Sequence, residues 1–228
     1  MAKRQQREHR RIITDVNPMS PISEAYRTLR TNLQYAGADR ELQVLMVTSA
    51  SPKEGKSTTI LNLAAAYAQS ERKVILVDAD LRKPTAHYTF GLSNRSGLSH
   101  LLSGQTQLDG LVQPSGIPGL DVLTAGPLPP NPSELLGSAR MDSLLGKLRE
   151  QYDIVLIDTP PVLAVSDAQV AAAGCDGVLL VVNARTGKRQ YALKARNALE
   201  FVKAKVVGVV LNEMPQRDAG PYYEYAER

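Results

Sequence analysis

The sequence is poor in cysteine, in long apolar runs and in net charge beyond its first residues. Its single cysteine, Cys175, excludes an internal disulfide and is typical of a reducing compartment. No apolar run approaches the roughly 18 residues that a membrane-spanning helix requires, and no signal peptide is recognisable. We therefore expect a cytoplasmic protein that does not span a membrane by itself.

The excess of positive charge lies at the N-terminus. Residues 1–11 hold five basic residues against Glu8, a net charge of +4, which leaves 22 basic and 22 acidic residues in the rest of the chain. This balance predicts a body that does not bind nucleic acid. We interpret residues 1–19 as a flexible basic arm, which is either simply solvated or a hook for anionic lipid or an acidic partner. The basic residues are Lys3, Arg4, Arg7, Arg10 and Arg11.

The central motif of the chain is a predicted phosphate-binding loop. Residues 50–57 fit G-x-x-x-x-G-K-[ST], with Ala50 in place of the first glycine. An apolar run over 44–47 precedes the loop and an amphipathic pattern over 60–68 follows it, which predicts strand, loop and helix in that order. A helix N-terminus presents free backbone N–H groups and a partial positive charge to a phosphate.

The motif assigns a role to each of its residues. Gly55 lets the backbone approach the phosphate, Lys56 reaches the β- and γ-phosphates, and the Ser57 hydroxyl binds Mg²⁺. The sequence therefore predicts a site for ATP and Mg²⁺. The predicted nucleotide-binding residues of the loop are Ser51, Pro52, Lys53, Glu54, Gly55, Lys56, Ser57 and Thr58.

Acidic residues follow two further predicted strands. The apolar run 74–77 ends in Asp78 and Asp80, and the run 154–157 ends in Asp158. In open α/β sheets ligands bind at the carboxyl ends of the strands, so these three side chains are candidate magnesium ligands beside the loop.

The rest of the chain alternates between helical and strand patterns. We expect a short helix at 98–102, a strand at 120–123 and a helix over 133–149 that Ser133 caps. Strands over 178–182 and 206–211, joined by a helix over about 188–203, complete the pattern. This pattern predicts one α/β domain over 20–212, with a mostly parallel sheet of buried strands covered by helices on both faces.

A helix is predicted to begin at Ser20 and Pro21, with an apolar stripe of Ile22, Tyr26, Leu29 and Leu33. Glu24, Arg27 and Arg30 lie three residues apart on its other side. Glu24 and Arg27 can pair within the helix, or the charged ridge can dock on a neighbouring subunit. Spacing alone favours the pairing within the helix.

The C-terminal segment 213–228 loses the apolar pattern and is interpreted as a mobile tail. Tyr222, Tyr223 and Tyr225 lie within the last seven residues, beside acidic neighbours. An extended chain from Asn212 to Tyr222 reaches at most about 35 Å. That reach is long enough to bring the phenols into the nucleotide site of a neighbouring copy.

Together these features resemble the bacterial tyrosine kinases (BY-kinases), in the form whose cytoplasmic kinase domain is a separate polypeptide. The loop 50–57, the Walker A′ segment ending in Asp78 and Asp80, the Walker B segment ending in Asp158 and the terminal tyrosines carry the resemblance. Glu24-x-x-Arg27-x-x-Arg30 matches the segment that family members use to assemble rings, and this match favours a subunit contact. The tail has fewer tyrosines than in many members.

The resemblance implies a P-loop fold of the deviant-Walker type and an ATP-dependent tyrosine autokinase. Its substrate would be its own tail, phosphorylated in trans, and its role the control of capsular or extracellular polysaccharide synthesis and export. Asp78 is expected to face the tyrosine hydroxyl, Arg82 to add positive charge and Asn212 to contact adenine. The implied partners are a separate membrane-protein activator that recruits the chain to the inner membrane face, other tyrosine substrates and a cognate phosphatase.

Two readings compete with an autokinase. Partitioning and division-site ATPases of the deviant-Walker type hydrolyse ATP without a protein substrate, but they place a lysine directly after the first loop residue, where this chain has Ser51. Alternatively, the chain binds ATP as a regulatory module and its tail serves as a docking peptide.

Overall fold

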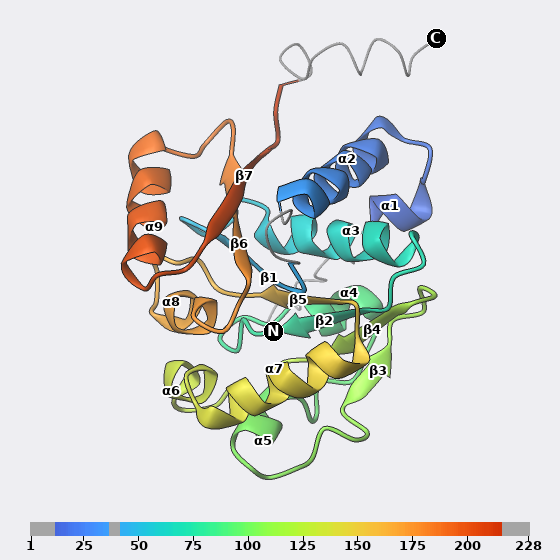
Figure 1. Ribbon diagram of the computed structural model, residues 1–228, viewed down its shortest axis with the longest axis vertical. Helices are drawn as coiled ribbons and strands as arrows, with labels where there is room; N and C mark the ends of the chain where they lie inside the picture. Colours follow the sequence, from blue (N-terminus) through green and yellow to red (C-terminus); the bar gives the residue numbers. More distant parts are fainter. Residues whose placement is uncertain (1–11, 37–41, 216–228) are drawn as a thin grey trace, which may run out of the picture.

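A seven-stranded sheet forms the centre of the molecule (Figure 1), in a computed structural model that describes residues 12–36 and 42–215. The strand order is β3-β4-β2-β5-β1-β6-β7, and every neighbouring pair is parallel except β3 with β4. This order confirms the predicted α/β class. The strands are β1 (Val44–Ser49), β2 (Val74–Asp78), β3 (Val112–Pro114), β4 (Leu120–Leu123), β5 (Ile154–Asp158), β6 (Gly177–Asn183) and β7 (Val206–Asn212).

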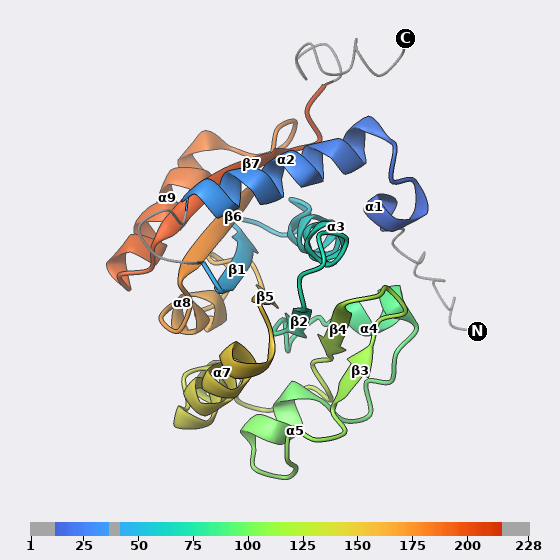
Figure 2. The ribbon, with the colours of Figure 1, turned by 45° about the vertical axis from the view of Figure 1, so that its right-hand side comes forward.

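Helices cover both faces of the sheet, which is clear after a 45° turn (Figure 2). One apolar cluster joins the sheet to Ile12, directly before α1 (Ile13–Val16), and to α2 (Pro21–Ala36), α3 (Lys56–Ala68) and α4 (Ala86–Phe90). A second cluster, on the opposite face, includes residues of α5 (Leu98–Leu102), α6 (Pro132–Leu136), α7 (Ala139–Gln151), α8 (Asp167–Ala172) and α9 (Arg189–Phe201).

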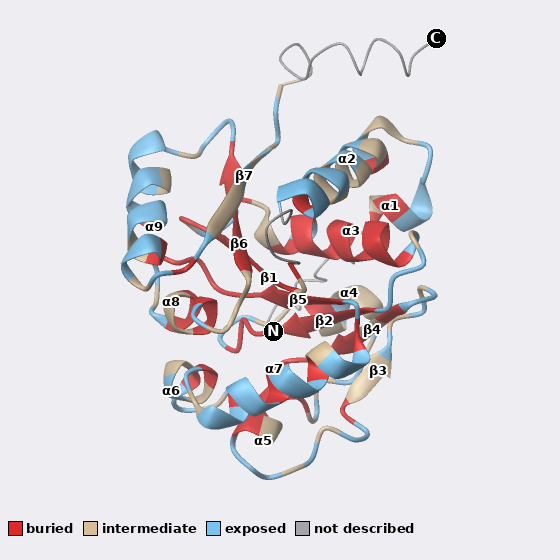
Figure 3. Cartoon of the chain, viewed as in Figure 1, coloured by how far each residue is buried: buried red, intermediate tan, exposed pale blue. Residues whose placement is uncertain are grey.

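The innermost strands are buried on both faces because their side chains meet a helix layer on each side. Every residue of β1, β2, β5 and β6 is buried (Figure 3). Such continuous apolar runs are typical of parallel sheets. All these strands point the same way, so their carboxyl ends, with Asp78 and Asp158 directly paired, meet at one edge.

The beginning of the chain differs from the expectation of a free arm up to residue 19. Ile12 and Thr14 are buried, and the Thr14 N–H and hydroxyl both donate to Asn62 Oδ1 on α3, each at 3.1 Å. Ile12 and Thr14 therefore pack on the domain, whereas residues 15–19 are exposed. Residues 1–11 lie outside the described structure. Ser20 caps α2 as predicted, because its Oγ accepts the Ser23 N–H at 3.1 Å.

Four other expectations need correction. The apolar stripe of α2 does not begin at Ile22, which is 47% exposed. The helix expected over 133–149 is two helices, since the chain turns at 137–138, and Ser133 lies inside α6 rather than capping it. Strand β3 has only three residues and was not predicted. Strand β7 is a half-exposed edge strand, with Val209 57% and Leu211 55% exposed, because no further strand covers it among the described residues.

The described residues also bear on membrane insertion. None of their helices is long and apolar enough to pass through a bilayer.

Candidate active site

The phosphate-binding loop connects β1 to α3 and ends in a left-handed turn. Gly55 has φ of +94° at the N-cap of α3, a conformation that favours glycine, and no side chain of the described ranges caps the helix. The first N–H groups of α3 are therefore available to an anion. Ala50 is buried and is not among the residues with positive φ, so a residue with a Cβ fits where the motif has its first glycine.

Glu54 is folded into the loop rather than exposed. Its carboxylate accepts the Ser51 N–H at 2.9 Å, and the residue is 4% exposed. Ser49 Oγ donates to the Ser51 carbonyl at 2.8 Å. These two bonds hold the loop in shape from its start at the end of β1 to the turn before α3.

The side chain of Lys56 is the centre of the site. Its ammonium donates to Ser57 Oγ, Asp80 Oδ2 and Asp158 Oδ1, each at 3.1 Å. Burial alone lowers the pKa of Lys56, but the charges of Asp158 and Asp80 outweigh it, so the pKa is raised. The structure thus brings together four residues that lie up to 102 positions apart in the sequence.

Asp78 ends strand β2, where it is paired with Asp158 of β5, and it is fully buried. Its Oδ2 accepts the N–H groups of Thr85 and Ala86, both at 2.9 Å, whereas Oδ1 has no hydrogen-bond partner among the described residues. Burial is the main cause that raises the pKa of Asp78 to about 7, and the charge of Asp158 on the neighbouring strand adds to it. Asp78 is therefore a carboxyl group that changes charge near neutral pH.

The donor set fits magnesium. Three oxygens, from Ser57, Asp80 and Asp158, already converge on one cation, the Lys56 ammonium, and the unpartnered Asp78 Oδ1 is a further acceptor. In the described part of the chain, no group of three or more His, Cys, Asp and Glu side chains is arranged to hold a metal ion alone. Mg²⁺ commonly uses one or two carboxylates, and water and phosphate oxygens complete its shell.

Arg82 makes a contact that the sequence analysis missed. It forms a bidentate ion pair with Asp167, which is fully buried at the start of α8. Nothing in the sequence pointed to Asp167, because 85 positions separate it from Arg82 and it belongs to no motif. The pair fixes the direction of the Arg82 side chain next to Asp80.

Asn212 lies against the loop at the end of β7. Its side-chain amide donates to the Glu54 carbonyl at 3.1 Å, and a Cβ built on Gly55 would lie 1.9 Å from that amide nitrogen. A hollow of about 500 Å³ opens beside it. The walls of the hollow are residues 51–54 of the loop, Asn183, the 186–188 segment, Tyr191 and Glu213.

The charged ridge of α2 is bonded within the chain. Arg27 pairs with Glu24 at 2.7 Å and donates to the Pro18 carbonyl at 2.6 Å, while Arg30 donates to the Ala66 carbonyl of α3 at 2.6 Å. All three side chains remain partly exposed. The terminal tyrosines Tyr222, Tyr223 and Tyr225 lie outside the described residues.

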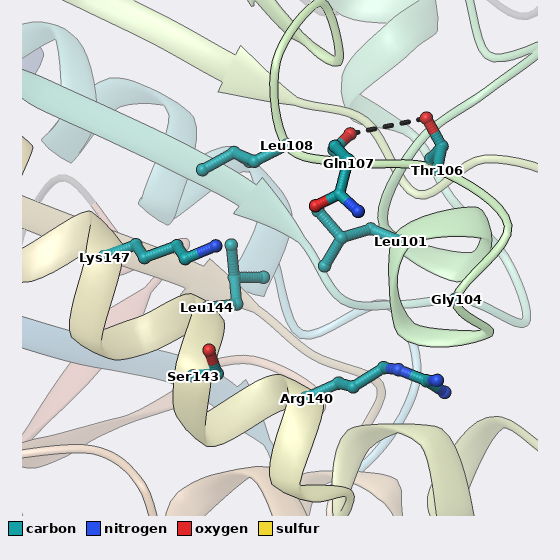
Figure 4. Close-up of a pocket in the computed structure, with 9 residues that line it drawn as sticks. All are labelled: Leu101, Gly104, Thr106, Gln107, Leu108, Arg140, Ser143, Leu144 and Lys147. Carbon is teal, nitrogen blue, oxygen red and sulfur yellow. Dashed lines mark hydrogen bonds between the residues drawn. The ribbon is translucent and has the colours of Figure 1, made fainter.

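A second hollow, of about 240 Å³, lies between α5 and α7 (Figure 4). Arg140 and Lys147 of α7 line it together with the loop that follows α5, and none of the predicted site residues that the structure describes contributes to it. We therefore place the candidate active site at the phosphate loop alone.

Comparison with known proteins gives relatives over almost the whole chain. The tyrosine-protein kinase YwqD of Bacillus subtilis (strain 168) is 47% identical over 206 residues, 90% of this chain and 87% of the relative. The putative tyrosine-protein kinase CapB of Staphylococcus aureus is 41% identical over 211 residues, 92% of each chain.

Solved structures agree with these relatives. The crystal structure of the chimerical protein CapA2B2 superimposes with a TM-score of 0.87 at 44% identity and covers 90% of both chains. The septum site-determining protein MinD of Pyrococcus horikoshii OT3, at 23% identity and a TM-score of 0.65, shares the fold.

A family model described as an AAA domain matches residues 43–205, the part of the chain that holds the loop and all three aspartates. The chain is therefore an α/β P-loop protein, and with these relatives it belongs to the bacterial tyrosine-protein kinase family.

Proposed function

We propose that this kinase transfers the γ-phosphoryl group of ATP to Tyr222, Tyr223 and Tyr225 of a neighbouring copy. The observation that carries the proposal is the convergence of Ser57, Asp80 and Asp158 on the Lys56 ammonium beside a free helix N-terminus. Phosphoryl transfer depends mostly on positioning and on neutralising charge, which such a group supplies.

In the reaction, the tyrosine oxygen forms a bond to the γ-phosphorus and the bond from that phosphorus to the β,γ-bridging oxygen breaks. Lys56 and the N–H groups at the start of α3 would hold the phosphates. Ser57, Asp80 and Asp158 would hold Mg²⁺, which supplies charge neutralisation on the β- and γ-phosphate oxygens when bound. When ATP binds, the Lys56 ammonium would leave the carboxylates of Asp80 and Asp158 and donate its hydrogen bonds to phosphate oxygens instead.

The phenol proton needs an acceptor, and Asp78 is our candidate. Its Oδ1 accepts no hydrogen bond from the part of the chain that the structure describes, and its pKa is raised to about 7. A carboxylate with this pKa accepts a proton efficiently near neutral pH. Asp78 is fully buried in the structure, so the bound nucleotide and the incoming tyrosine must open a path to Oδ1.

The remaining nucleotide contacts follow from the hollow beside the loop. Its volume of about 500 Å³ lies within the range of small-molecule sites. We assign the adenine and ribose to it, with Asn212 and the exposed edge of Tyr191 at its border. Arg82, fixed by Asp167, would add positive charge on the side of the site next to Asp80.

We further propose that copies assemble, as a ring or a smaller oligomer, through the ridge formed by Glu24, Arg27 and Arg30. Assembly brings one copy's tail to the next copy's site. Each added phosphate brings about −1.5 to −2 charges to a tail that already contains glutamates, and the repulsion releases the tail. The cycle predicts that the Tyr222/Tyr223/Tyr225→Phe variant assembles but stays assembled with ATP; its rapid disassembly would contradict the cycle.

The biological setting is proposed from the relatives. Regulation of capsular or extracellular polysaccharide synthesis and export fits the BY-kinase resemblance. So do a membrane-protein activator that recruits the kinase to the inner face of the membrane, additional tyrosine substrates and an opposing phosphatase. The solved chimerical relative CapA2B2 supports a partnership with a second protein.

The decisive test is the intact mass of the purified full chain after incubation with Mg²⁺ and ATP, followed by peptide mapping. We expect one to three phosphates, all in the terminal peptide. Lys56→Met should abolish them, whereas Lys147→Met, a matched loss of an exposed lysine away from the loop, should not. If ATP is hydrolysed at high protein concentration and the tail stays unmodified, a MinD-like ATPase switch becomes the better assignment.

A further inference from the structure

The body of the chain has no net charge, but the structure shows that its charge is not evenly spread. Residues 185–205, which comprise α9 and the segments on either side of it, contain seven basic residues and one acidic residue, a net charge of +6. The even balance of the whole body therefore conceals a local excess of positive charge. The basic residues are Arg185, Lys188, Arg189, Lys194, Arg196, Lys203 and Lys205.

All seven basic side chains are exposed. Helix α9 lies at the rim of the molecule, next to the edge strand β7, and its outer surface faces solvent (Figure 3). Among the described residues, only one of these seven cations forms an ion pair with a carboxylate: Arg196 pairs with Glu200 at 2.7 Å. By contrast, Arg82 is paired with the buried Asp167, and Arg149 with the half-buried Asp176, elsewhere in the fold.

Large apolar side chains lie among these cations. Ala195 and Leu199 are buried against the sheet, so at 3.6 residues per turn Arg189, Leu193, Asn197 and Phe201 form a ridge along the opposite side of α9. Leu193 is 42% exposed and Phe201 is 87% exposed. Both side chains therefore present apolar area on the same ridge, and cations border this ridge on either side.

We propose that this outer face of α9, with its flanking segments, binds directly to a bilayer surface that contains anionic phospholipid. Six of these cations, all except Lys188, which lines the hollow beside the phosphate loop, complement lipid phosphates. Leu193 and Phe201 can enter the boundary between headgroups and acyl chains, as on interfacial helices. The 13 residues of α9 give a contact about 20 Å long. This contact is independent of phosphoryl transfer and of any protein partner.

The surface suits a bilayer better than a phosphorylated peptide. A phosphopeptide is bound by cations that converge on one point, whereas these cations are distributed along both flanks and beyond both ends of a helix. Helix α9 begins beside Lys188, which lines the hollow at the phosphate loop. Docking through α9 would therefore hold the nucleotide edge of the sheet close to the membrane.

The test measures sedimentation of the full chain, without ATP, with vesicles of phosphatidylcholine mixed with phosphatidylglycerol and with vesicles of phosphatidylcholine alone. We expect binding to the anionic vesicles only, weakened by salt. Lys194→Glu/Lys203→Glu should lower the partition coefficient at least about tenfold. Arg95→Glu/Lys147→Glu, with the same change in net charge on other elements, should change it much less.

A second variant separates a bilayer from a purely electrostatic partner such as duplex DNA. Phe201→Ser should lower vesicle binding several-fold while the salt dependence and the melting temperature stay as in the wild type, because Phe201 is 87% exposed. The proposal is overturned if the wild type does not bind anionic vesicles, if both double variants lose binding equally, or if the Lys194/Lys203 variant binds as the wild type does. Variant-sensitive binding to DNA with no vesicle binding would also overturn it.

Discussion

Arg82 and Asp167 form a bidentate ion pair, with Nε 2.8 Å from Oδ2 and Nη2 3.0 Å from Oδ1. The pair joins the segment after β2, two residues beyond Asp80, to the first residue of α8. The Asp167 side chain is completely buried, whereas the Arg82 side chain is 39% exposed. The carboxylate therefore depends on Arg82 for neutralisation, and Arg82 depends on Asp167 for its direction.

Replacing Asp167 by asparagine should destabilise the fold and weaken phosphoryl transfer together. The change keeps the size of the side chain but removes the charge that holds Arg82. Because water reaches Arg82, we expect a loss of about 2 kcal/mol in the free energy of unfolding, less than for a fully buried pair. Urea unfolding measures it, with Glu200→Gln as the control for an exposed pair, which should cost less than about 1 kcal/mol. Equal small losses in both variants would show that the Asp167 pair is no more important than a surface pair.

The stability of the protein should fall as the pH rises toward neutrality because of Asp78. Its pKa is about 7 in the folded protein, against 3.8 as the ordinary value, so the folded state holds an extra proton between these values. Where the folded state binds more protons, the free energy of unfolding decreases with pH. The stabilisation from Asp78 is thus present at acid pH and is lost as the pH passes about 7.

The variant Asp78→Asn isolates this effect, because asparagine can still accept the N–H groups of Thr85 and Ala86. The difference in unfolding free energy between variant and wild type should grow with pH, by at most about 1.4 kcal/mol per pH unit, and level off above pH about 7. Parallel stability curves in magnesium-free buffer would mean that Asp78 is not protonated in the folded protein. Comparing the two proteins cancels the opposite trend from Asp176, whose pKa is lowered because Arg149 and backbone N–H groups offset its burial.

The elements that hold the site were predictable from sequence because local signals agree there. The runs 44–47, 74–77 and 154–157 are continuous and apolar, and the loop motif fixes the start of α3 at Lys56. Where local signals were weak the prediction failed. The three residues of β3 show no alternation, and the break at 137–138 lies inside a sequence of otherwise helical character.

Contacts between distant segments could not be predicted even where both residues were visible. The sequence predicted that Lys56 binds phosphate, but not that its ammonium lies 3.1 Å from Asp80, which follows β2, and from Asp158 at the end of β5. No sequence motif indicated Asp167. The family resemblance suggested that Asn212 contacts adenine, but it did not predict the hydrogen bond from Asn212 to the Glu54 carbonyl. Total charge also concealed the excess on α9, because an equal acidic excess elsewhere in the body offsets it.

Gly55→Ala should weaken nucleotide binding, because the new side chain clashes with Asn212. The new Cβ would lie 1.9 Å from the Asn212 amide nitrogen, and the backbone has φ of +94°, which is strained for alanine. We expect ATP affinity to fall at least about tenfold, as measured by calorimetry. Asn212→Ala, which loses the hydrogen bond to Glu54 without strain, should weaken ATP binding by a smaller factor. The double variant removes the clash but keeps the strain, so full recovery would show that strain is unimportant.

Magnesium without nucleotide should stabilise Lys56→Met far more than the wild type. In the wild type the Lys56 ammonium already occupies the point where oxygens of Ser57, Asp80 and Asp158 converge. Methionine leaves these oxygens without a cation, so the variant should melt below the wild type in EDTA and regain stability as Mg²⁺ binds the folded state. Lys56→Arg, which keeps a positive charge, is the control and should respond weakly to Mg²⁺. Equal shifts of Tm with Mg²⁺ in all three proteins would place the metal elsewhere and remove the assignment of Asp80 and Asp158 as its ligands.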